Sequence, residues 1–166
     1  MEQKQPVKRK RRWGDRYDGR RLRSLDAFSR VSPYIMVTRN TSSNHFMDTI
    51  DIDEIERYIR HKRNDDGLVG FGIMHVLIAA YVRSLSQKPA VNRFIAGQKI
   101  YARNSVQINL TVKREMRSDA LETVIKISPE LDATATEVYE LIKKEIDLSK
   151  NNNQSDFDKT AKILDY

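Results

Sequence analysis

The chain has 166 residues, a net charge of +7 and no cysteine, which excludes disulfides, thiolate nucleophiles and cysteine-ligated metals. No apolar run approaches the roughly eighteen residues that a membrane span needs, and the basic N-terminus lacks the apolar segment of a secretory signal. We therefore expect one cytoplasmic domain with no membrane partner.

The positive charge is concentrated at the N-terminus. Residues 1–30 hold eleven Lys and Arg against four acids, whereas the remaining 136 residues hold nineteen of each. We expect residues 1–18 to be a disordered basic leader, because they are charged and poor in apolar residues. The run Lys8–Arg12 could contact phosphates, although a solvated tail is the simpler interpretation. Elsewhere the even charge balance makes a nucleic-acid partner unexpected.

Before residue 70 the patterns predict two strands and two helices. Arg20–Leu25 fits a short edge strand, and Ser32-Pro33 fits the start of a helix, with serine as the cap and proline in the first turn. His45–Ile52 predicts a strand by alternation. Asp51–Glu54 resembles a capping box for a helix that ends near Gly67.

The central stretch predicts a buried helix followed by a β-ribbon. Apolar residues recur at three- and four-residue steps from Phe71 to Gln87, and Lys88-Pro89 stops the helix. Two β-rich runs follow at Lys99–Ala102 and Val106–Val112, with Arg103-Asn104-Ser105 between them as a hairpin turn. We expect the helix to lie across a sheet that contains this ribbon.

The last third predicts a strand and a helix. Thr123–Ile127 is β-rich, and Thr134–Glu137 is a capping box followed by apolar residues at helical spacing. Residues 151–166 are expected to form a linker and one more helix that runs into the end of the sequence.

Four stretches in this order resemble the acyltransferase family that includes chloramphenicol acetyltransferase and the catalytic domain of dihydrolipoyl acyltransferases. Together they span roughly residues 19–150. They are Ser29–Arg39 with the polar loop after it, Asp48–Glu54, Met74–Phe94 and Ile100–Val112.

The resemblance implies an α/β (α+β) fold, a two-layer sandwich with a mixed sheet. It implies a homotrimer whose active sites lie between subunits, and acyl transfer between coenzyme A and a hydroxyl or a dihydrolipoyl thiol. The co-substrate would be a coenzyme A thioester, the acceptor a small molecule, and no cofactor would be bound tightly. The family's general base is a histidine in a His-x-x-x-Asp-Gly motif near the end of a longer chain.

No His-x-x-x-Asp-Gly occurs in this sequence, so we assign no catalytic residue. His75 lies beside the apolar stripe of the predicted helix, where a hydrogen-bonded structural histidine is the expectation. His45 and His61 are expected at the surface, and three isolated histidines predict no metal site. Asn109 and Thr111 share a strand face that could line the family's substrate channel, although ordinary strand positions are the simpler interpretation.

Two functions follow from these patterns. The first is an acyltransferase-family domain, incomplete in the part that carries the histidine, and therefore inactive alone, because acyl transfer needs a base within hydrogen-bond reach of the attacking group. The alternative is a non-catalytic binding or assembly module whose basic leader contacts an acidic partner or nucleic acid. Whether the chain acts as an enzyme stays open at this point.

Overall fold

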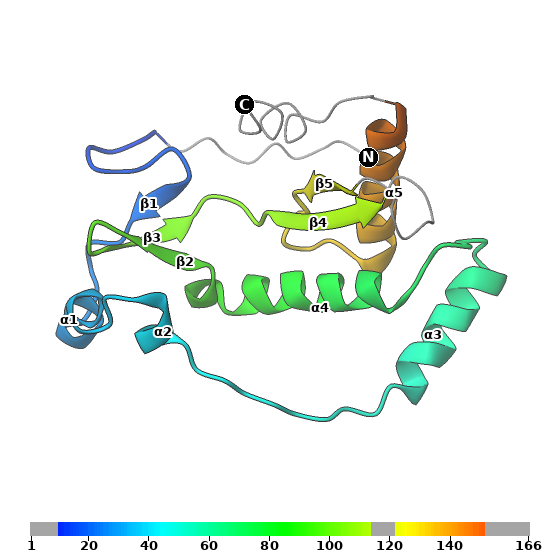
Figure 1. The fold of residues 1–166 in the computed structure, drawn as a ribbon, viewed down its shortest axis with the longest axis horizontal. Coiled ribbons are helices and arrows are strands. Elements are labelled where there is room, and N and C mark those ends of the chain that lie inside the picture. Colours follow the sequence, from blue (N-terminus) through cyan, green and yellow to red (C-terminus); the bar gives the residue numbers. More distant parts are fainter. Residues whose placement is uncertain (1–9, 114–121, 152–166) are drawn as a thin grey trace. The chain divides into compact units, whose positions relative to one another are not determined.

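The computed structural model describes residues 10–113 and 122–151, and this part of the chain is α+β. It divides into two compact units, which are described separately. Unit 1 contains residues 10–46 and 89–104, and unit 2 contains residues 47–88 and 105–151 (Figure 1). No helix in the described ranges is long and apolar enough to cross a lipid bilayer.

Unit 1 is built on a three-stranded antiparallel sheet with the order β1-β3-β2. Strand β1 is Gly19–Arg21, β2 is Arg93–Ala96 and β3 is Lys99–Arg103. A two-residue turn at Gly97 and Gln98 joins β2 to β3, and both residues have positive φ (54° and 58°), as a type I′ hairpin requires.

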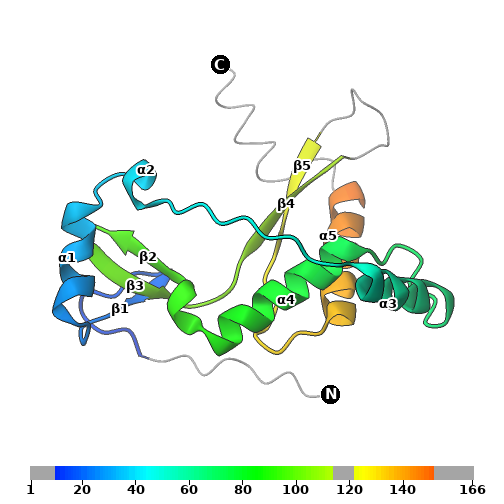
Figure 2. The ribbon, with the colours of Figure 1, turned by 90° about the horizontal axis from the view of Figure 1, so that it is seen from below.

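Three short helical segments complete unit 1. Helix α1 (Ala27–Ile35) packs against β3 (Figure 2), α2 covers Arg39–Ser42, and a single 3₁₀ turn covers Pro89–Val91 just before β2. The side chain of Asp26 caps α1 by accepting the Ser29 amide at 2.9 Å.

Aromatic rings and guanidinium groups hold the sheet of unit 1 together. The rings of Phe94 and Tyr101 stack with centroids 5.3 Å apart, and the Arg103 guanidinium lies 4.6 Å from the Phe94 centroid. Gly19 lies under the Phe94 ring, where a Cβ would stand 2.5 Å from Phe94 Cε1 and 2.9 Å from the Ala102 carbonyl oxygen. Only glycine lets β1 approach so closely, so this position sets the pairing of β1 with β3.

We predict that Gly19→Ala destabilises the protein by about 1–3 kcal/mol, the usual cost of overpacking a closed site. Thermal unfolding followed by circular dichroism measures the loss. Gly70→Ala is the matched control, because the nearest atom to a Cβ there is 3.5 Å away, an ordinary contact. Equal melting temperatures for both variants would contradict this account of β1.

Unit 2 places two long helices against a two-stranded sheet. Helix α4 is Ile73–Gln87 and α5 is Ala135–Asn151, while β4 (Ile108–Lys113) pairs antiparallel with β5 (Glu122–Ile127). One apolar core joins α4, α5 and β5, and its buried members are Ile78, Val82, Leu85, Val106, Ile125, Ile127, Val138 and Ile142. Helix α3 (Asp53–Asn64) contacts α4, and a second core joins Ile59 of α3 to Phe71, just before α4, and to Tyr139 of α5.

The predicted ribbon of residues 99–112 is wrong. Strand β3 pairs with β1 and β2, whereas β4 pairs with β5, so the two runs belong to different sheets. Arg103-Asn104-Ser105 is one of three places where the chain passes between the units, instead of a hairpin turn. Every strand pair in the described residues is antiparallel, and no mixed sheet forms among them.

Two further expectations in the first half are corrected. Pro33 lies inside α1 instead of at its start, because Asp26 caps the helix seven residues earlier. Residues 45–52 form no strand and have no strand partner among the described residues. The apolar side chains there are exposed, and Phe46 is 90% exposed. Residues 10–18, the described part of the predicted leader, form hydrogen bonds, including one from Asn104 Nδ2 to the Tyr17 carbonyl at 3.1 Å.

Other predictions are confirmed. The helix from Phe71 to Gln87 is α4, and the strand at 123–127 is β5. The Thr134 amide donates to Glu137 Oε2 at 2.7 Å and Thr134 Oγ1 accepts the Glu137 amide at 3.3 Å, which is the expected capping box.

The capping expected at α3 differs in its partner, because the Asp51 side chain accepts the Asp53 amide instead of the Glu54 amide. The predicted final helix at 155–166 and most of the charged loop at 113–119 lie outside the described residues.

Candidate functional site

His75 is a buried structural histidine in an aromatic cluster. Its side chain is 7% exposed, and its ring stacks on Phe71 at 5.3 Å and meets the edge of Tyr139 at 5.2 Å. The Gly72 amide donates to His75 Nδ1 at 3.0 Å, at the start of α4. Burial lowers the pKa of His75 below its ordinary value of 6.5, so the imidazole is neutral in the folded protein.

This burial makes stability depend on pH. Because the folded pKa is lowered, the unfolded chain binds more protons below pH 6.5, and stability that is complete above that pH is lost as the pH falls toward the folded pKa. We predict that His75→Gln flattens the fall in the free energy of unfolding between pH 7.5 and 5, measured by urea titration. His45→Gln, at an exposed position, should keep the wild-type slope.

The other two histidines lie at the surface, and the described residues offer no metal centre. His61 is exposed and lies 3.6 Å from the Asp65 carboxylate in the last turn of α3, and His45 is exposed in the segment before it. No group of three or more His, Asp or Glu side chains in the described ranges could hold a metal ion. His75 Nδ1 is hydrogen-bonded to Gly72 and the ring packs against Phe71 and Tyr139, which is the environment of a structural histidine.

Asn109 and Thr111 lie where the sequence predicts, on one face of β4. Both are exposed, whereas Ile108, Leu110 and Val112 alternate with them and pack against the core of unit 2. Asn109 is paired with Lys126 and Thr111 with Val124 across the ladder to β5. The outer face of this sheet therefore presents Asn109 and Thr111 to solvent, and the exposed cation Lys126 lies opposite Asn109 in the register.

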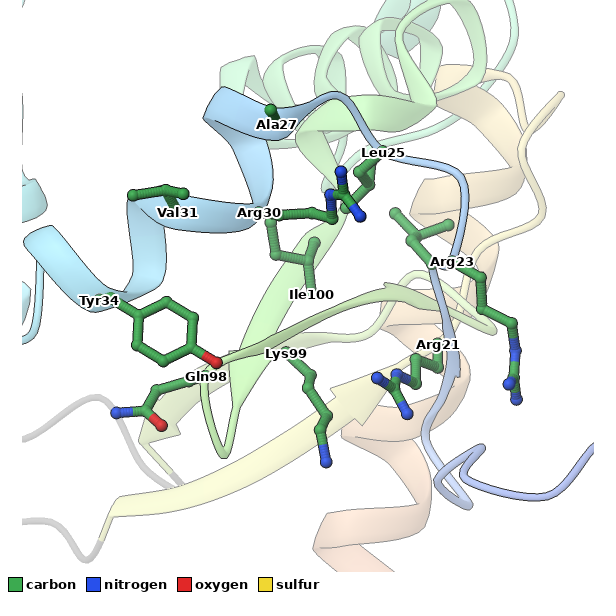
Figure 3. Close-up of a pocket in the computed structure, with 11 residues that line it drawn as sticks. Arg21, Arg23, Leu25, Ala27, Arg30, Val31, Tyr34, Gln98, Lys99 and Ile100 are labelled. Carbon is green, nitrogen blue, oxygen red and sulfur yellow. The ribbon is translucent and has the colours of Figure 1, made fainter.

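A hollow of about 650 Å³ opens in unit 1 and was not predicted from the sequence. It lies between β1 with the residues after it, α1 and the start of β3 (Figure 3). Four cationic side chains line it, together with an apolar floor and wall; the lining residues are Arg21, Leu22, Arg23, Leu25, Ala27, Arg30, Val31, Tyr34, Gln98, Lys99 and Ile100.

The hollow contains no carboxylate, because the nearby acids serve local structure. Asp15 accepts the backbone amides of Arg12 at 3.0 Å and Arg21 at 3.1 Å, and the first of these bonds is the main reason why its pKa is lowered. Asp26 caps α1, and its hydrogen bonds with Ser29 lower its pKa. Each of these carboxylates is therefore ionised and accepts hydrogen bonds from backbone amides.

Three of the four cations of the hollow have no ionic partner among residues 10–113 and 122–151. Neither Arg21, Arg30 nor Lys99 forms an ion pair with another described residue, and Arg23 donates to the Trp13 carbonyl. Four positive charges that share one concave surface create a local potential that attracts anions.

Sequence reasoning missed this hollow for a topological reason. Arg21, Arg23 and Arg30 are visible as a basic run, but Lys99 joins them only because β3 pairs with β1, in the register Arg21↔Tyr101. The available signal is the excess of arginine in residues 1–30, of which Arg21, Arg23 and Arg30 lie outside the predicted leader of residues 1–18.

Comparisons with protein-family models, with curated proteins and with solved structures found no match to this chain.

Proposed function

We propose that the chain is a chloramphenicol acetyltransferase-like acyltransferase domain that holds an acyl donor or acceptor without catalysing the transfer by itself. The observation that carries the proposal is the architecture of unit 2. Helices α4 and α5 share one core with β5, while the opposite face of β4 presents Asn109 and Thr111 to solvent. The resemblance implies that the strand equivalent to residues 106–112 partly walls the family's substrate channel, and the exposed face of β4 is available for that role.

The proposed ligand is an acyl thioester of the coenzyme A type or a dihydrolipoyl thiol. The arm of such a thioester carries amides. The side-chain amide of Asn109 and the hydroxyl of Thr111 can each donate a hydrogen bond to such an amide or accept one from it. Assembly into a homotrimer, as in the family, would let a neighbouring subunit cover this open face.

Catalysis is not expected from these residues. A general base must reach the attacking hydroxyl or thiol, and a donor aimed at the oxyanion contributes about 3 kcal/mol. The sequence has no His-x-x-x-Asp-Gly, and His75 is neutral, buried and already hydrogen-bonded. Binding without turnover is therefore the activity proposed for the chain alone.

We predict that S-acetylpantetheine, which has the thioester arm but no phosphate, perturbs the NMR signals of β4. The double variant Asn109→Leu/Thr111→Val should weaken binding about tenfold, because each lost hydrogen bond is worth about 0.5–1.5 kcal/mol. The control Thr49→Val/Asn64→Leu changes the same side-chain types at exposed positions of unit 2 and should bind like the wild type.

The same preparation should not transfer acetyl groups. Thiol release from acetyl-coenzyme A, with chloramphenicol or dihydrolipoamide as acceptor, is expected to stay at the rate without protein. Turnover above that rate would overturn the non-catalytic assignment. Equal binding by the Asn109/Thr111 double variant and the wild type would remove β4 as the site.

A further inference from the structure

We propose that unit 1 binds single-stranded nucleic acid, with phosphates held by Arg21, Arg30 and Lys99 in the hollow and a base stacked on Trp13 beside it. This inference does not rest on the acyltransferase proposal, because it concerns other residues and the other unit. It also extends the basic surface beyond a terminal leader, into a folded part of the chain.

The first argument is charge. The described part of unit 1 has twelve Lys and Arg residues against three Asp, a net charge of +9, and ten of the twelve cations are arginine. Arginine presents a planar fork of donors that matches phosphate and can also stack on bases, whereas lysine acts as a point charge. A small unit with this composition has the electrostatic footprint of a nucleic-acid surface.

The second argument is the availability of the cations. Asp15 and Asp26 are bound to backbone amides, and Asp18 pairs with Arg16 at 3.0 Å. Within the described residues, no carboxylate therefore neutralises Arg21, Arg30 or Lys99. Figure 3 shows these three side chains arising from three different elements around one hollow. Such a set suits consecutive phosphates on a flexible backbone.

The third argument is an aromatic platform at the rim. Trp13 is 89% exposed, and its carbonyl accepts a hydrogen bond from Arg23 Nη2 at 2.5 Å. A Cβ at the next residue, Gly14, would lie 3.8 Å from guanidinium nitrogens of both Arg21 and Arg23. The turn that carries Trp13 is thus adjacent to the cations of the hollow. An exposed indole next to phosphate-binding groups is the pairing that single-strand binding uses.

The aromatic platform favours a single strand over a duplex or an acidic protein. The bases of a duplex are already stacked on each other, so Trp13 could not take part without unstacking them. An acidic peptide would satisfy the cations but offers no regular series of π faces for the indole. Stacking contributes about 1–3 kcal/mol per base and tolerates any sequence, so we expect little base preference.

The test measures fluorescence anisotropy of labelled ten-nucleotide oligo(dT) and oligo(U) with the full chain at several salt concentrations. We expect binding that weakens with salt. In Arg21→Gln/Arg30→Gln/Lys99→Gln the slope of log K against log salt should fall by about 2, since each neutralised phosphate of a single strand contributes about 0.7. Arg30→Gln/Lys99→Gln changes only exposed residues and should lower the slope by about 1.4 if the triple variant fails to fold.

The matched control removes three exposed cations from unit 2 as Arg57→Gln/Arg60→Gln/Arg83→Gln, with the same change in net charge. It should keep most of the affinity and the wild-type slope. If this control loses as much affinity and slope as the variants of the hollow, oligonucleotide binding reflects the overall charge and the hollow is not the binding site. Displacement of the oligonucleotide by polyglutamate at equal charge, or equally tight binding of a duplex, would also overturn the proposal.

Trp13 separates stacking from charge. Trp13→Ala should weaken oligonucleotide binding about tenfold or more with an unchanged salt slope, because a base–aromatic stack is lost and no phosphate contact is. Trp13→Phe should recover most of that loss. Wild-type affinity in Trp13→Ala would remove the indole from the site. S-Acetylpantetheine binding should be the same in all these variants, so the two proposals fail independently.

Discussion

The antiparallel pairing of β3 with both β1 and β2 is the constraint on which unit 1 depends. β3 is the central strand, and its two ladders join residues 19–21 to residues 93–103. The closeness of β1 is possible because Gly19 leaves room for the Phe94 ring. The same pairing carries Lys99 to Arg21 and so creates the cationic hollow. Structure and candidate binding surface in this unit therefore share one cause.

Unit 2 depends on a different principle, the burial of apolar stripes. Val82 and Leu85 of α4 and Val138 and Ile142 of α5 meet Ile125 of β5 in one core, and a core of this kind is the main favourable term in folding. Successive side chains of β4 point to opposite faces of the sheet. Because Leu110 packs against the core, Asn109 and Thr111 lie on the solvent-exposed face. The polar face of the sheet is thus a consequence of the core behind it.

His75 illustrates how an ionisable group can be part of that core. The ring fills space between Phe71 and Tyr139, and Nδ1 satisfies the Gly72 amide, one of the amides at the N-terminus of α4 that have no partner within the helix. The cost is that the ring must stay neutral to be buried. A histidine in this setting fills the core and stabilises a helix terminus.

Local signals made much of the fold predictable. The period of α4, the capping box at Thr134 and the β-rich run of β5 each act within a few residues, so the sequence shows them directly. Predictions failed where partners are distant. Arg103–Ser105 has turn composition, yet β3 and β4 pair elsewhere, and the alternation of 45–52 specifies a face without supplying a partner strand.

By itself, the sequence determined α3, α4 and α5, the strands β3 to β5, the shared face of Asn109 and Thr111, the lack of cysteine and the excess of arginine in residues 1–30. Only the tertiary structure decided that β3 and β4 belong to different sheets, that His75 is enclosed by aromatic rings, and that Lys99 lies with Arg21 and Arg30. The physical reason is that helix periods and caps are local, whereas strand pairing joins residues far apart in the chain through backbone hydrogen bonds, which carry no mark of the partner's side chains.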